Sequence, residues 1–67
     1  MKKTYQLKNL GCASCALTMG KEIEKLEGVE SAKVNFMLRK LTITGDQPEK
    51  EDLQRIISSI EPDCRIL

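Results

Sequence analysis

The chain changes from extended to helical character within the stretch LGCASCALTMG, residues 10–20, which carries two cysteines three positions apart. Before it, residues 3–8 alternate polar and apolar side chains, which is typical of a strand with one buried face. After it, apolar residues recur at three- and four-residue spacing over residues 13–26 and predict one buried helical stripe. The members of this stripe are Ala16, Met19, Ile23 and Leu26. The sequence therefore predicts strand, loop and helix, with Cys12 in the loop and Cys15 in the opening turn of the helix.

The next part of the chain predicts two further strands. Gly28 ends the helix, because glycine readily adopts the positive φ of a helix stop. Residues 29–36 and 41–44 then alternate β-branched or apolar side chains with polar ones, as strands do. A short turn near residues 38–40 joins these strands, and Met37 is expected to pack in this turn.

A second helix and a last short strand complete the chain. Pro48 and the acidic residues that follow it predict a helix start, where carboxylates favour the positive end of the helix dipole. Pro62 ends this helix, whose buried stripe consists of Leu53, Ile56, Ile57 and Ile60. Residues 63–67 can form a strand with Cys64 and Ile66 on one face. The order βαββαβ predicts an α+β fold, in which two helices cover one face of a four-stranded antiparallel sheet.

The composition indicates one small globular domain, residues 1–67. Apolar residues make up 40% of the chain and charged residues 31%, which is typical of a globular rather than a disordered protein. The formal net charge is only +1 and the charges are interspersed along the sequence, so we expect no nucleic-acid partner. No apolar run approaches the roughly 20 residues that span a bilayer, and the chain opens with polar residues rather than an apolar signal sequence. We therefore expect a cytoplasmic domain that does not insert into a membrane.

The cysteine content points to thiol chemistry rather than to a disulfide framework. The chain has three cysteines and no histidine, and secreted disulfide frameworks normally use an even number of cysteines. The amino end of a helix lowers the pKa of nearby thiols and favours thiolates, which are metal ligands. Thiolates select soft or borderline ions such as Zn(II) and Cu(I) over Mg(II) or Ca(II). Cys12 and Cys15 would supply only two of the four ligands of a structural zinc site, so the site would be open and exchangeable.

Two other interpretations of the cysteine pair are open from the spacing alone. Redox proteins use the same spacing, so the chain could be a thiol–disulfide oxidoreductase with Cys12 as its nucleophile. Against this, the chain is short for a thioredoxin-like fold, and Ala13 and Ser14 differ from the usual intervening pair. Alternatively, the two cysteines could be small buried residues in a helix corner. The spacing and the loop favour metal binding by a module that is not an enzyme.

Four segments of the chain resemble heavy-metal-associated domains, and the resemblance runs over essentially the whole chain. They are LGCASCA at residues 10–16, EGV at residues 27–29, VNF at residues 34–36 and LTI at residues 41–43. Domains of this family occur as small metallochaperones and as amino-terminal modules of metal-transporting P-type ATPases. The resemblance implies a ferredoxin-like fold, which agrees with the order of elements predicted above.

The resemblance also implies that Cys12 and Cys15 bind a soft metal ion and transfer it by ligand exchange. The implied partner is a metal-donor or metal-acceptor protein, or an ATPase domain, with exposed thiols. The domain is then expected to be a monomer that can form a metal-bridged dimer. The chain departs from the family's usual Gly-Met-Thr/Ser/Asp-Cys loop, since it has Asn9-Leu10-Gly11-Cys12. Asn9 tolerates a left-handed backbone, Leu10 can fill the buried place of the methionine, and Gly11 removes a side chain beside the metal.

A third ligand is expected after the second helix. In a ferredoxin-like fold the last strand lies antiparallel to the first, so Glu61, Asp63 and Cys64 lie near the cysteine loop. Two carboxylates and a thiol suit a divalent ion that takes more than two ligands, whereas copper-handling members often carry an aromatic residue or a lysine there. The predicted ligands are Cys12, Cys15 and Glu61, with Zn(II), Cd(II) or Pb(II) favoured and Cu(I) as the alternative. For Cys64 a core role is favoured, because it faces inward in the predicted last strand.

These features together predict a module that binds a soft heavy-metal ion and transfers it. The carboxylates near the site favour the amino-terminal domain of a zinc-, cadmium- or lead-exporting P-type ATPase, as a cytosolic part of a membrane transporter. A stand-alone copper(I) chaperone is the alternative. A thiol–disulfide oxidoreductase is the least favoured interpretation.

Overall fold

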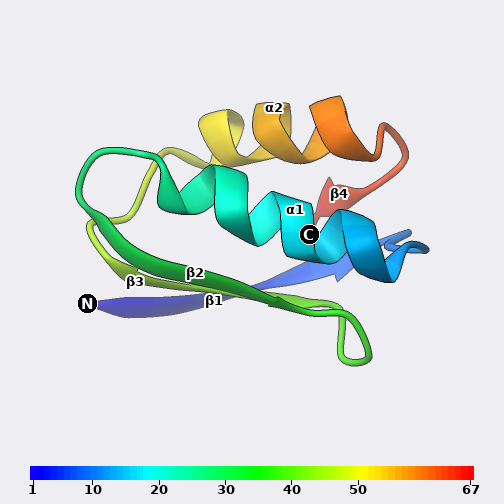
Figure 1. Ribbon diagram of the computed structural model, residues 1–67, viewed down its shortest axis with the longest axis horizontal. Helices are drawn as coiled ribbons and strands as arrows, with labels where there is room; N and C mark the ends of the chain where they lie inside the picture. Colours follow the sequence, from blue (N-terminus) through cyan, green and yellow to red (C-terminus); the bar gives the residue numbers. More distant parts are fainter.

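The computed structural model describes all 67 residues and has the predicted order of elements. These elements are β1 (Lys2–Lys8), α1 (Ala13–Glu24), β2 (Val29–Asn35), β3 (Lys40–Gly45), α2 (Lys50–Ile60) and β4 (Arg65–Ile66). Both helices lie on the same side of the sheet (Figure 1). The predicted α+β architecture, a ferredoxin-like fold with a four-stranded antiparallel sheet, is confirmed. Neither helix combines the length and the apolar character needed to cross a bilayer.

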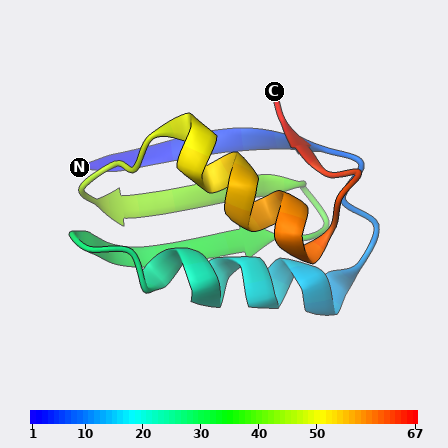
Figure 2. The same cartoon turned by 90° about the horizontal axis from the view of Figure 1, so that it is seen from above.

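The strand order β2-β3-β1-β4 determines which loops lie together. β3 is antiparallel to both β1 and β2, and β4 is antiparallel to β1. β1 and β2 therefore run in the same direction, and the segments that follow them leave the sheet at the same end. One of these segments is the cysteine loop, residues 9–12, and the other is the turn of residues 36–39. The connection from α2 to β4 reaches the same end, because β4 starts beside the end of β1 (Figure 2).

Twelve buried residues form one core between the sheet and the helices. Ten of them come from the inner face of the strands and from the helices, and Leu10 and Cys64 come from the connecting segments. The strand and helix periods therefore meet in one apolar layer. Residues of this core with no solvent exposure are Met19, Ile23, Leu41, Ile43, Leu53, Ile57 and Cys64. The prediction that Cys64 is a core residue is therefore confirmed.

α1 protects one free edge of the sheet. β2 is an edge strand, and Figure 2 shows α1 running beside it. The Ala32 N–H donates to Glu24 Oε2 at 3.0 Å. Gly20 permits this close approach, because a Cβ at its position would lie 3.0 Å from the Ala32 carbonyl oxygen. These contacts protect the middle of β2 from pairing with another strand.

The ends of three elements differ from their predictions. α1 ends two residues earlier than predicted, at Glu24. α2 begins at Lys50, so Pro48 precedes the helix rather than opening it. β4 is only two residues long, because the Cys64 N–H donates to the Glu61 carbonyl in a turn and is not available to the sheet. At the end of α1 and before β4, short local hydrogen bonds replace the regular pattern.

The turn between β2 and β3 also differs from its prediction. Met37 does not pack in the turn, since 82% of its surface is exposed. The turn bends to the side of the sheet away from the helices (Figure 1), where Gln6 Nε2 donates to the carbonyls of Leu38 and Arg39 at 3.3 and 3.1 Å. Asn35 Oδ1 accepts a further hydrogen bond from the Leu38 N–H at 3.0 Å. Polar contacts therefore hold this turn, and packing by Met37 is not required.

Candidate metal centre

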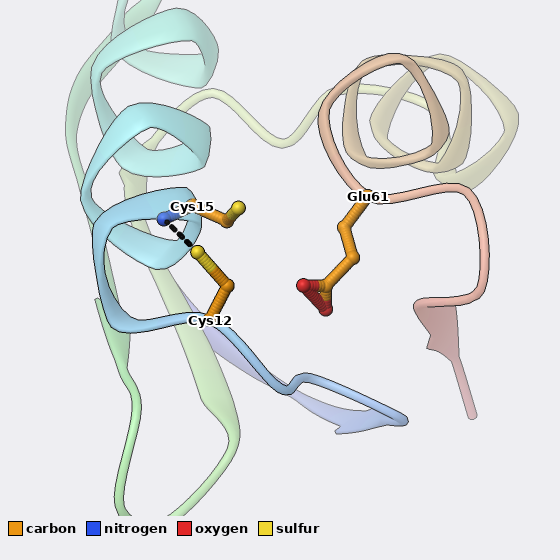
Figure 3. A group of neighbouring side chains, drawn as sticks. All are labelled: Cys12, Cys15 and Glu61. Atoms are coloured by element: carbon orange, nitrogen blue, oxygen red, sulfur yellow. Dashed lines mark hydrogen bonds between the residues drawn. The ribbon is translucent and has the colours of Figure 1, made fainter.

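Cys12 and Cys15 are positioned by the start of α1. Cys12 is the N-cap residue and has extended backbone angles, with φ −138° and ψ 116°. Its sulfur accepts a hydrogen bond from the Cys15 N–H at 3.2 Å (Figure 3), so a thiol takes the role that Ser, Thr, Asp or Asn usually has at this position. Residues three apart at a helix start lie on the same side. The prediction that Cys12 lies in the loop and Cys15 in the opening turn is confirmed.

The residues before Cys12 shape the loop as the sequence predicts. Asn9 has a left-handed backbone, with φ 63°. Leu10 is only 5% exposed and anchors the loop in the core. Gly11 is exposed, and a Cβ at its position would meet no atom within 4 Å. Position 11 therefore has room for a side chain, and the structure shows no steric need for its glycine.

Glu61 approaches the cysteines from the end of α2 (Figure 3). It is the C-cap residue of this helix, and its Oε1 accepts a hydrogen bond from the Gly11 N–H at 2.9 Å. A second hydrogen bond joins the same two segments, since Asn9 Nδ2 donates to the Asp63 carbonyl at 3.3 Å. The cysteine loop is therefore tied to the α2–β4 connection. Sequence reasoning missed this tie, because the direction of a loop N–H leaves no signal in the sequence.

The structure brings the three predicted ligands together. One ligand atom each of Cys12, Cys15 and Glu61 lies within 4.8 Å of the other two, and Figure 3 shows the three side chains around a common space. All three residues are partly exposed, so an ion and a second protein can reach them. Asp63 contributes only its backbone carbonyl to the loop contact, and Cys64 is fully buried. These two residues do not join the cluster.

The two thiols of the cluster differ in acidity. The pKa of Cys12 is lowered, chiefly because the Cys15 side chain donates a hydrogen bond to its sulfur, and the Ser14 hydroxyl and the Cys15 N–H donate as well. The same side-chain hydrogen bond raises the pKa of Cys15 to about 11, with burial and the charges of Cys12 and Glu61 adding to the increase. The expectation that the helix start favours a thiolate therefore holds for Cys12 and is wrong for Cys15.

Ser14 has a role that the sequence analysis missed. Its Oγ lies 3.3 Å from Cys12 Sγ, so the hydroxyl can donate a hydrogen bond that stabilises the Cys12 thiolate. A hydroxyl residue between the two cysteines was the available signal. At the start of a helix, such a residue can turn its side chain back toward the N-cap.

Comparison with known proteins assigns most of the chain to the family that the sequence resembles. Residues 4–64 match the heavy-metal-associated domain. A probable cadmium-transporting ATPase of Alkalihalophilus pseudofirmus is 39% identical over 49 residues, which cover 73% of this chain and 7% of that ATPase. The mercuric transport protein periplasmic component of Serratia marcescens is 31% identical over 58 residues, which cover 87% of this chain and 63% of that protein. The solved structure of a CopZ metallochaperone superposes with a TM-score of 0.78 at 14% identity, covers 100% of both chains and shows the shared fold.

The matched region contains the cysteine loop, both helices and nearly all of the first three strands. It is the region in which the thiol pair and Glu61 converge. The match identifies a metal-binding module rather than an enzyme. The chain therefore belongs to the heavy-metal-associated domain family, and Cys12 and Cys15 form its cysteine-pair site.

Proposed function

We propose that this domain binds a soft or borderline divalent cation through Cys12, Cys15 and Glu61 and passes it to the thiols of a partner protein. The observation that carries the proposal is the convergence of two sulfurs and one carboxylate oxygen within 4.8 Å at an accessible end of the fold. The cation is cargo, because three protein ligands leave the fourth tetrahedral position for an incoming ligand.

The ligand set favours Cd(II), Zn(II) or Pb(II) over Cu(I). Two thiolates supply soft ligands, and Glu61 adds an oxygen ligand that a divalent ion accepts. Glu61 can bind an ion while it stays tied to the loop, because a carboxylate has two oxygens and Oε1 accepts the Gly11 N–H. The name of one relative supports this choice, since it is a probable cadmium-transporting ATPase. A copper-exporting P-type ATPase is also similar to this chain, so Cu(I) stays the alternative.

The order of ligand exchange follows from the difference in pKa between the Cys12 and Cys15 thiols. Cys12 has the lowered pKa, so it captures the ion of a donor first. Cys15 holds its proton in the metal-free domain and releases it to become the second thiolate ligand. Glu61 then completes a shell of three protein ligands. A thiolate of the acceptor attaches at the open position before the domain's own ligands leave, so the ion is never released into water.

The domain is proposed to work in the cytoplasm as the amino-terminal part of a zinc-, cadmium- or lead-exporting ATPase, or as a separate protein that supplies one. The 39% identity to the probable cadmium-transporting ATPase supports the first alternative. In either case the partner is a protein domain with exposed thiols, and the domain is a monomer that a shared ion can bridge to a second copy. One relative is a periplasmic component, so cell fractionation of the full-length protein tests the location.

Titration with Cd(II), Zn(II), Pb(II) and Cu(I) against competing chelators tests the ligand set. Glu61→Gln keeps an oxygen for the Gly11 N–H but removes the charge. We expect Cd(II) affinity to fall at least about tenfold, because the loss of even an outer-shell partner of a metal ligand costs that much. Cu(I) affinity should stay unchanged. Asp63→Asn is the matched control, because it removes a neighbouring carboxylate outside the cluster and should change neither affinity. Equal losses for both ions in Glu61→Gln would refute the third ligand, and much tighter Cu(I) binding would favour a copper(I) chaperone.

A further inference from the structure

The face of the sheet that turns away from the helices carries cations. Strand alternation and the pairing register place four exposed lysines on this face: Lys2, Lys8, Lys33 and Lys40. We call this surface the basic sheet face. It corresponds to the side of the sheet opposite the helices, which is the lower side in Figure 1. Most of its other paired positions hold neutral polar residues, as in the contact between Thr4 Oγ1 and Thr42 Oγ1 at 3.3 Å. Arg65 is paired with Lys8, but its guanidinium turns back to donate to the Pro62 carbonyl.

No ion pair neutralises the lysines of the basic sheet face. The ion pairs of the structure join Lys25 to Glu22 and Arg55 to Asp52, so none of the four lysines takes part in one. All acidic residues except Glu30 lie in helices or connecting segments, and Glu30 lies in the irregular start of β2. The charges are interspersed along the sequence, but the pleat of the sheet places these four lysines on one side, whereas Lys3 lies on the other face with Tyr5. A nearly neutral domain therefore carries one cationic surface.

The turn of residues 36–39 adds an apolar tip to this surface. It bends to the same side of the sheet (Figure 1), where Gln6 holds it by two hydrogen bonds. Met37 is 82% exposed and Leu38 is 59% exposed, and the cationic Arg39 follows them. Large apolar side chains on a fixed, exposed turn are unfavourable in water and mark an interaction site when they gather with charges. Apolar groups flanked by cations suit the interface of an anionic bilayer, where the former enter the headgroup boundary and the latter meet lipid phosphates.

We propose that the basic sheet face and the turn of residues 36–39 dock the domain on the surface of an anionic lipid bilayer. This inference rests on the proposed function, because a domain that belongs to an exporting ATPase, or supplies one, works beside a membrane. Docking by this face leaves the metal site free, since Cys12 and Cys15 lie at the start of α1 on the helix side of the sheet (Figure 1). The ion can therefore be exchanged while the domain stays at the membrane.

Co-sedimentation of the metal-free chain with lipid vesicles tests this docking. At low salt we expect binding to vesicles of phosphatidylcholine with about one third phosphatidylglycerol, and no binding to pure phosphatidylcholine. Added salt should weaken the binding, because it screens exposed charges. Met37→Ser combined with Leu38→Ser should also weaken it, although the net charge is unchanged. Binding to neutral vesicles as strong as to anionic ones, or no binding to anionic vesicles, would overturn the proposal.

A matched pair of double variants tests which face binds. One lysine close to an anionic surface is worth about a fivefold change in affinity, so Lys33→Gln with Lys40→Gln should weaken vesicle binding about 25-fold. Lys50→Gln with Arg55→Gln removes the same charge from α2, on the helix side of the sheet, and should leave the binding nearly unchanged. Equal losses in the two variants would overturn the proposal. Tighter binding to a DNA duplex than to vesicles at the same salt would overturn it as well and assign the face to nucleic acid.

The metal site offers a test that is independent of vesicle binding. Cys12→Ser with Cys15→Ser should lose Cd(II) binding and bind anionic vesicles as the original chain does. Loss of vesicle binding in this variant would contradict docking by the basic sheet face. Failure of the wild-type chain to bind Cd(II), with vesicle binding intact, would instead refute the proposed function alone.

Discussion

Replacing Cys64 by alanine distinguishes the structural role of its thiol from the metal-binding role of the other two thiols. Cys64 is fully buried, and burial is the main cause that raises the pKa of its thiol, so it is a neutral core side chain at neutral pH. Loss of its sulfur leaves a small cavity, which should lower the free energy of unfolding by about 1 to 2 kcal/mol. For a domain of this size the melting temperature should fall by about 4 to 16 °C.

Thermal unfolding with and without Cd(II), followed by circular dichroism, tests this distinction by measuring the melting temperature. An ion that binds only the folded state raises the melting temperature, so saturating Cd(II) should raise it by a similar amount in the wild type and in Cys64→Ala. Cys12→Ser should keep the wild-type melting temperature without metal, because serine is a good N-cap, and should lose the Cd(II) effect. The reasoning is refuted if Cys64→Ala loses the Cd(II) effect, or if metal-free Cys12→Ser is destabilised as strongly as Cys64→Ala.

Three further predictions concern the thiols and the loops. Iodoacetamide should alkylate Cys12 before Cys15 in the metal-free protein, because only Cys12 has a lowered pKa. Peptide mapping by mass spectrometry after a short reaction measures the order of alkylation, and faster labelling of Cys15 would contradict the prediction. Between the pKa of Cys12 and the pKa of about 11 of Cys15, Cd(II) uptake should release one proton per ion, so the apparent affinity should rise about tenfold per pH unit. Titration in a weakly buffered indicator solution measures the release, and uptake without protons would exclude binding by Cys15. Gly28→Ala should lower the free energy of unfolding by about 1 to 2 kcal/mol, because Gly28 has φ +88° and a Cβ there would overlap the Asp46 carboxylate. Urea unfolding measures the change in stability. Gly11→Ala is the control, since a Cβ at Gly11 meets no atom within 4 Å. Equal stability of Gly28→Ala and the wild type would show that the reasoning is wrong.

The fold was predictable because each element buries one regular face. Met19 and Ile23 recur at helical spacing and Leu41 and Ile43 at strand spacing, and all four are fully buried. Element ends were less predictable, because they depend on single hydrogen bonds. The turn in which the Cys64 N–H donates to a carbonyl shortens β4, and no periodic pattern encodes such a contact.

The candidate site was predictable as a set of residues, but its chemistry was not. The spacing of Cys12 and Cys15 and the antiparallel last strand were sufficient to bring Glu61 to the same place. The unequal acidity of the thiols depends on which sulfur accepts the hydrogen bonds, and this is a property of three-dimensional geometry. The basic sheet face was not predicted for a similar reason, because its lysines become neighbours only through the pairing of the strands.

X-ray absorption at the cadmium edge of the Cd(II)-loaded domain tests the central claim most directly, because it counts the sulfur and oxygen ligands of the bound ion. With one ion per chain, the proposed site predicts two sulfur ligands, from Cys12 and Cys15, with oxygen ligands completing the shell. A third sulfur ligand, or a shell with fewer than two sulfurs, would contradict the account.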